Sequence, residues 1–163
     1  MRNSPLRLKE LFFPKVSVTA LVPKDPEATS REIEMDDLDI SFGLDVKEDG
    51  KQASAGLKIA SKKAGTEDAS FYDIEINAFA NFDVNGPEYQ DAMAVYLRKF
   101  AAAAALIGAA REQVALMTAR GPWGVVMLPI ISMDRVVGAP PKKAALPDAP
   151  AKKATKAKKL PAK

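Results

Sequence analysis

The stretch YDIEINAFANFDV, residues 72–84, decides the fold class. Every even-numbered position in it carries an apolar side chain, while the odd-numbered positions are mostly polar. Side chains of a β-strand point alternately to its two faces, so a period of two indicates a strand with one buried face. This stretch therefore predicts a long, half-buried strand in a sheet.

Two shorter stretches upstream show the same alternation, in residues 38–46 and 53–59. The turn between them contains Gly50, which can adopt the positive φ that a tight reversal requires, so the two strands form a hairpin. Short turns connect all three strands, which are therefore antiparallel. Residues 6–22 have a less regular strand pattern that Pro14 interrupts. They predict a fourth strand that is bent or lies at an edge of the sheet.

A helical region follows the strands, beginning at Pro87, because a proline suits the first turn of a helix. Gly108 is the one residue between positions 88 and 120 that breaks helices, and it predicts a kink or a junction of two helices. Apolar residues recur there at spacings of three and four, which predicts a buried helix face made of Leu106, Ile107, Ala110, Val114 and Met117.

The helix is expected to end at Gly121, which is placed for a left-handed cap and is followed by a proline. Residues 123–131 then predict an apolar extended segment. The fold class is α+β, with a four-stranded antiparallel sheet and a C-terminal helical region.

The composition restricts the possible functions. The chain has 163 residues, of which 47% are hydrophobic and 28% charged, as in a single globular domain. It contains no histidine and no cysteine, which excludes His-based acid–base catalysis, cysteine nucleophiles, structural zinc and disulfides. We therefore expect no metal, no cofactor and no ordinary enzymatic activity.

The charge is distributed unevenly along the chain. Residues 139–163 contain eight lysines and one aspartate, a net charge of +7, while residues 1–138 hold sixteen basic and twenty acidic residues, a net charge of −4. The Ala/Pro/Lys composition of residues 139–163 offers too little apolar bulk to offset the entropy of ordering, so we expect a folded domain over 1–138 and a disordered tail over 139–163.

Neither a membrane span nor a signal peptide is expected. The longest apolar run, residues 100–110, has 11 residues, whereas a transmembrane helix needs about 20. Charges interrupt the N-terminal residues before an apolar signal segment can form. These features predict a cytoplasmic protein.

Three further features are open to two interpretations. Asp37, Asp39 and Asp45 share one strand face, and a solvated acidic surface is favoured over a carboxylate pair or a cation site because nothing shelters them. Trp123 is either a packing anchor or a ligand contact. The run 101–105 of five alanines is either a plain core helix or a helix face that contacts another subunit.

The order of these elements, together with one motif, resembles the SecB family of protein-export chaperones. The motif runs from Ala110-Arg111-Glu112 through Arg120-Gly121-Pro122-Trp123 to Leu128-Pro129-Ile130, and the resemblance covers roughly residues 5–135. It implies a homotetramer, a dimer of dimers assembled through helices and sheet edges. Such tetramers are ATP-independent holdases that bind unfolded polypeptides in apolar grooves and commonly pass them to the SecA motor for protein export and translocation.

The resemblance also implies candidate site residues. Client binding is assigned to apolar residues of two strands and the segment after the helix: Leu11, Phe12, Phe13, Phe42, Leu44 and Trp123. Contact with SecA is assigned to Asp73 and Glu75, although the family's acidic first-strand positions are Lys15 and Thr19 here. The oligomer interface is assigned to the helix residues Ala101, Ala103, Ala104 and Ile107.

Two other departures from the family pattern affect the groove. Residues 23–34, where the family has an aromatic crossover loop, contain no aromatic residue, and residues 132–137 with the lysine tail replace the family's closing helix. Two alternative functions follow. A sub-branch of SecB-like chaperones holds the antitoxin of a toxin–antitoxin module. The lysine tail could also make the protein a nucleic-acid-binding scaffold or attach it to other anionic surfaces by charge alone.

Overall fold

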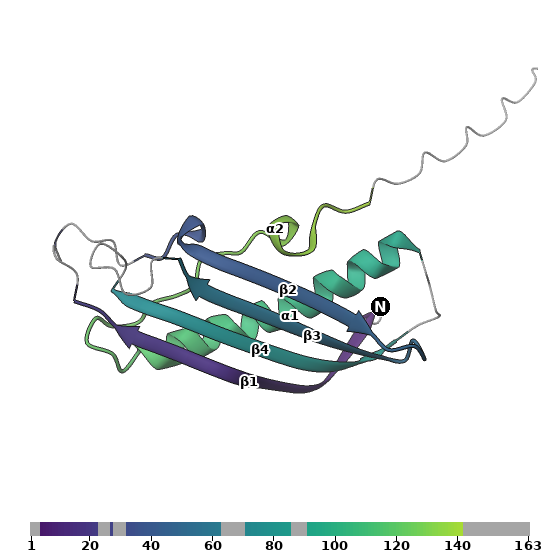
Figure 1. The fold of residues 1–163 in the computed structure, drawn as a ribbon, viewed down its shortest axis with the longest axis horizontal. Coiled ribbons are helices and arrows are strands. Elements are labelled where there is room, and N and C mark those ends of the chain that lie inside the picture. Colours follow the sequence, from purple (N-terminus) through teal and green to yellow (C-terminus); the bar gives the residue numbers. More distant parts are fainter. Residues whose placement is uncertain (1–3, 23–26, 28–31, 63–70, 86–90, 142–163) are drawn as a thin grey trace, which may run out of the picture.

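The computed structural model describes residues 4–22, 27, 32–62, 71–85 and 91–141. The α+β prediction is confirmed (Figure 1). The elements are β1 (Leu6–Ala20), the short 3-10 helix η1 (Met35–Asp37), β2 (Leu38–Val46), β3 (Gln52–Ser61), β4 (Tyr72–Val84), α1 (Ala92–Thr118) and α2 (Met133–Val137).

The four strands form one antiparallel sheet in the order β1-β4-β3-β2. The stretch that alternates most regularly, β4, lies inside the sheet, and β1 and β2 are its edges. The irregular N-terminal stretch is an edge strand as predicted, and its pairing with β4 shifts register between Phe12 and Lys15. Pro14 lies within this irregularity, where its missing N–H breaks no ladder.

The core lies between one face of the sheet, the inner face, and α1, which crosses behind the sheet in Figure 1. Even-numbered residues of β4 from Tyr72 to Phe82 are buried, as the alternation predicts. The buried helix face differs from the prediction at its end, because Met117 is 45% exposed and Thr118 is buried in its place. The Thr118 hydroxyl donates to the carbonyl of Val114 within the helix, so its polarity is satisfied.

The predicted break at Gly108 is wrong. Helix α1 runs without interruption from Ala92 to Thr118, with the Asp91 carboxylate accepting a hydrogen bond from the N–H of Met93 at its start. One glycine costs a helix only about 1 kcal/mol relative to alanine, and the alanine-rich flanks favour continuation.

The left-handed cap predicted at Gly121 is also wrong. Among the described residues, those with positive φ are Gly50, as the hairpin requires, Gly124 and Gly138. Gly121 is needed for a different reason: a Cβ there would overlap the hydroxyl of Tyr72 and lie 3.0 Å from its ring carbon Cζ. The chain can turn at this point only because residue 121 has no side chain.

Residues 119–137, which we call the strap, extend from the end of α1 to the end of α2. At one end, the indole N–H of Trp123 donates to the carbonyl of Leu21, just beyond β1, at 2.8 Å. At the other end, Arg135 pairs with Asp36, just before β2, at 2.9 Å. The strap therefore joins the two edges of the sheet. It also includes the five-residue helix α2, so residues 132–137, expected only to replace a helix, form a short one.

Several predictions lie outside the described residues: the disorder of the lysine tail beyond residue 141, the turn after Lys62, most of the loop 23–34 and the helix start at Pro87. Against the expectation of no membrane span, α1 has the length and hydropathy of one. This is weak support for a span, because the core helix of a folded domain passes the same criteria and one face of α1 packs on the sheet.

Candidate functional site

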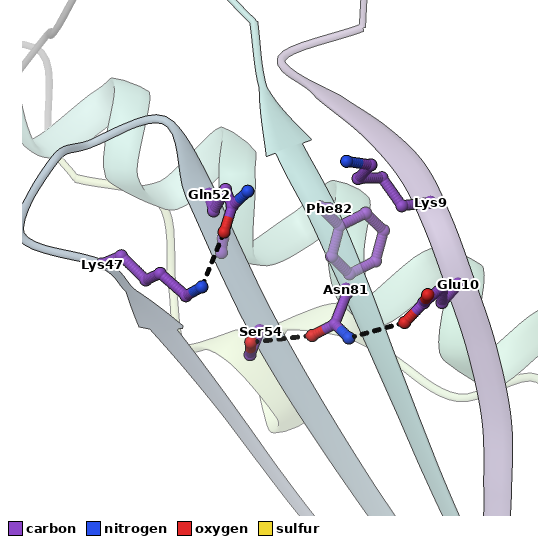
Figure 2. Close-up of a pocket in the computed structure, with 8 residues that line it drawn as sticks. Lys9, Glu10, Lys47, Gln52, Ser54, Asn81 and Phe82 are labelled. Atoms are coloured by element: carbon purple, nitrogen blue, oxygen red, sulfur yellow. Dashed lines mark hydrogen bonds between the residues drawn. The ribbon is translucent and has the colours of Figure 1, made fainter.

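The face of the sheet opposite α1, the outer face, is mainly polar. Near the β2–β3 hairpin it holds a hollow of about 210 Å³ (Figure 2). The Ser54 hydroxyl donates to Asn81 Oδ1 at 2.9 Å, and Asn81 Nδ2 donates to Glu10 at 3.1 Å, so a hydrogen-bonded row crosses β3, β4 and β1. This end of the outer face has little to offer an apolar ligand.

One apolar row crosses the middle of the outer face. Phe12 faces Phe79, with ring centroids 5.1 Å apart, and Gly56 and Gly43 continue the row onto β3 and β2. Because glycine has no side chain, the row ends in a shallow hollow of about 440 Å³ that Phe79 borders. Phe12, a predicted client contact, thus lies on the outer face, 46% exposed.

The two acidic residues assigned to partner contact, Asp73 and Glu75, are half-buried on the outer face. Lys15 on β1 and Lys58 on β3 flank Glu75, with Nζ to carboxylate distances of 2.5 and 3.5 Å. The hydrogen bond from Lys15 lowers the pKa of Glu75 below its ordinary value, and the charges of both lysines act in the same direction. Glu75 is therefore already neutralised by its own neighbours.

The predicted client contacts do not form one groove. Phe42 and Leu44 are half-buried on the inner side of β2, while Leu11 and Phe13 are half-buried on β1, at the opposite edge of the sheet. Two strands separate the edges, so these pairs are about 14 Å apart at a strand spacing of ~4.8 Å. Trp123 is a packing anchor, since its ring lies 5.1 Å from that of Phe71 and its N–H is bonded to Leu21.

Exposed apolar side chains gather instead where α1 meets the strap. The N–H of Val126 donates to the Thr118 hydroxyl at 2.9 Å, which fixes the strap against the last turn of the helix. Val126, Leu128 and Ile131 then point into the core. Three residues between them on the strap are exposed, as are two in the last turn of α1, and we call these five residues the apolar strip: Val125, Met127, Ile130, Leu116 and Met117. Ile130 is 85% exposed and Val125 60%.

Sequence reasoning missed this strip for identifiable reasons. Residues 125–128 are all apolar, so no alternation reveals which of them point outward. Met117 lies next to the buried helix face and was assigned to it. The sequence signal for the strip is the length of the apolar stretch. When a single layer covers such a segment, one side is buried and the other stays exposed.

The helix residues assigned to an oligomer interface divide between core and surface. Ala103 and Ile107 are buried against the sheet within the subunit, so they face away from any partner. Ala104 is exposed and Ala101 half-buried. Leu97 and Phe100 are exposed one turn earlier, so the outward side of α1 is apolar here too.

Among the described residues, no group of three or more acidic side chains is arranged to hold a metal ion. The solvated acidic surface favoured for Asp37, Asp39 and Asp45 agrees with the exposure of Asp39 and Asp45, whereas Asp37 is half-buried and lies in η1 instead of on the strand face. The part of the chain that the structure describes thus offers apolar contact area.

Comparison with known proteins gives matches to solved structures only. No protein family and no curated protein matches the sequence. Among solved structures, the chain is similar to the Rv1957 SecB-like chaperone of Mycobacterium tuberculosis, determined in complex with a ChAD peptide from the Rv1956 HigA1 antitoxin. The TM-score is 0.52 at 12% sequence identity, covering 78% of this chain and 91% of the other. The chain therefore has a SecB-like fold.

Proposed function

We propose that the protein is a cytoplasmic, ATP-independent chaperone that holds unfolded polypeptide segments on the apolar strip. The observation that carries the proposal is the outward row of Val125, Met127 and Ile130 on a strap whose alternate residues are buried. Exposed apolar patches mark interaction sites, and apolar burial requires no fixed hydrogen-bond pattern, so it suits varied clients. The SecB-like fold and the lack of histidine and cysteine support a binding function over a catalytic one.

The test is suppression of aggregation of a chemically unfolded protein without ATP. We expect Val125→Ser/Met127→Ser to lose most of the suppression while far-UV circular dichroism is unchanged. The matched control is Leu8→Ser/Phe12→Ser, which removes two apolar side chains of similar exposure, 47% and 46%, from β1. Full activity of the strip variant would refute the proposed site, and loss only in the control would move it to β1.

The antitoxin-holding function is the second candidate. The observation that favours it is the structural neighbour, which is a SecB-like chaperone bound to an antitoxin peptide. Identifying the polypeptides that co-purify with the protein from its native host distinguishes the two functions. Many precursors with signal peptides would support export, and one small partner would support the antitoxin role.

Transfer to SecA is the least supported part of the export proposal. The sheet carries Lys15 where the family has an acidic residue, and that lysine neutralises Glu75. An acidic docking face for SecA would have to rely on Asp73 alone among the two assigned residues. We therefore expect Lys15→Glu, which restores an acidic position and leaves Glu75 paired with Lys58 alone, to strengthen SecA binding in a titration.

Assembly into a tetramer is proposed through the outward side of α1. Ala104, Leu97 and Phe100 give this side small and apolar character. Light scattering should give a tetramer mass that Ala104→Trp reduces, while Ala104→Ser leaves it unchanged.

A further inference from the structure

Among the described strands, β2 lies at one edge of the sheet. Within the described residues no strand pairs with its far side. Such an edge presents unpaired N–H and C=O groups and is a template for another strand unless something covers it. Four outer-face residues follow one another along β2, all exposed: Asp39, Ser41, Gly43 and Asp45.

Charge indicates what fits this edge. Neither Asp39 nor Asp45 forms an ion pair with any other part of the chain that the structure describes. Residues 142–163 of the same chain contain eight lysines and one acidic residue. The edge and the C-terminal segment therefore have opposite charge.

The spacing of charges also matches. Residues 151–160 are the longest stretch of the C-terminal segment without proline, so all of their backbone N–H groups can pair. Lys153 and Lys159 are six positions apart, as are Asp39 and Asp45. In each set, two small residues of the same strand face lie between the charges: Thr155 and Ala157 in one, Ser41 and Gly43 in the other.

The connection is long enough. Arg135 of α2 pairs with Asp36 at 2.9 Å, so α2 lies within side-chain reach of the start of β2. The thirteen residues 138–150 reach about 45 Å when extended at ~3.5 Å each, whereas the nine residues of β2 span about 30 Å. The segment can therefore reach either end of β2.

We propose that residues 151–160 bind along the edge of β2 as an added strand, with Lys153 and Lys159 beside Asp39 and Asp45. The ion pairs lie on the surface and are screened by salt, so the attachment is reversible. On the proposed chaperone function, the segment also competes at this edge with an extended client and lowers client affinity.

The test uses the absence of native cysteine, which lets Ala162→Cys carry a single nitroxide label on the full-length protein. We expect the label to broaden the amide NMR signals at one end of β2, which also gives the strand direction. The broadening should disappear near 1 M salt, where the Debye length is about 3 Å. No broadening of β2, or broadening only elsewhere, would overturn the proposal.

Matched variants test the register. Lys153→Glu/Lys159→Glu should abolish the broadening, whereas Lys142→Glu/Lys143→Glu, with the same change of charge, should retain it. Adding Asp39→Lys/Asp45→Lys to the first variant should restore it. Equal behaviour of the two lysine variants would overturn the assigned register. Because this readout needs no client, loss of chaperone activity with broadening intact would refute only the proposed function.

Discussion

The inner and outer faces of β4 belong to the same strand but differ in burial. Ile74, Ile76 and Ala80 are completely buried on the inner face, whereas Glu75 and Asn77 are half-buried on the outer face. The inner face gains stability from contact with α1, and the outer face from polar contacts between strands. The strap, by contrast, has apolar residues such as Ile130 and Val125 that are 85% and 60% exposed.

The largest expected effect is on the inner face. Ile76→Ala should lower the free energy of unfolding by about 2–5 kcal/mol, because it leaves a cavity that the packed layer cannot fill. Phe79→Ala, three residues along on the outer face, should cost at most about 2 kcal/mol, since solvent can fill the space. Chemical denaturation at one protein concentration measures both. Equal losses would show that the outer face is also covered.

Replacing glycine by alanine should have different effects on stability on the two sides of the sheet. Gly121→Ala should cost about 1–3 kcal/mol, because the new methyl group overlaps Tyr72. Gly43→Ala on the outer face should cost nothing or stabilise, since no atom lies within 4 Å of its Cβ position and alanine is favoured over glycine in a strand. Thermal unfolding of the two variants compares them, and a stable Gly121→Ala would contradict the close approach.

The contact between the rings of Phe12 and Phe79 on the outer face should contribute less to stability. A double-mutant cycle of Phe12→Leu and Phe79→Leu should give a coupling of about 0.5–1.5 kcal/mol, as for other aromatic pairs in contact. The cycle isolates the ring contact from the loss of apolar area. A coupling near zero would mean that the pair contributes by burial alone.

The smallest expected effect concerns pH. The pKa of Glu75 is lowered by its hydrogen bond with Lys15, so its contribution is present above the unfolded value near 4.5 and is lost as pH falls through the folded value. Glu75→Gln should flatten this acid-side decrease in Tm. Asp73→Asn is the matched control on the same face. An unchanged acid-side slope in Glu75→Gln would show that solvent screens the pair completely.

The strands could be predicted from sequence because one buried face imposes a period of two, and β2 and β4 begin and end where the alternation does. The helix was predicted in position but not in continuity, because the cost of Gly108 is small against its alanine-rich surroundings. Gly121 could not be interpreted from sequence, since its close neighbour, Tyr72, is 49 positions away.

The candidate site was much less predictable than the fold. Phe12, Phe42 and Trp123 were assigned to client contact as apolar residues from the family resemblance, and they lie on the outer face, on the inner side of β2 and against Phe71 respectively. Whether an apolar residue is exposed depends on whether another element packs over it. In the strap, that is decided by the hydrogen bonds between Thr118 and Val126, which join residues whose types carry no periodic signal.

The order of the elements along the chain has a consequence for synthesis. All four strands precede residue 85, but the layer that buries their inner face comes from α1 and from strap residues as late as Ile131. A ribosome adding ~5–20 residues per second needs roughly 2 to 9 s to supply those 47 residues. During that interval the apolar inner face of the strands is not yet buried. The nascent chain then exposes apolar segments, as do the unfolded polypeptides that the protein is proposed to hold.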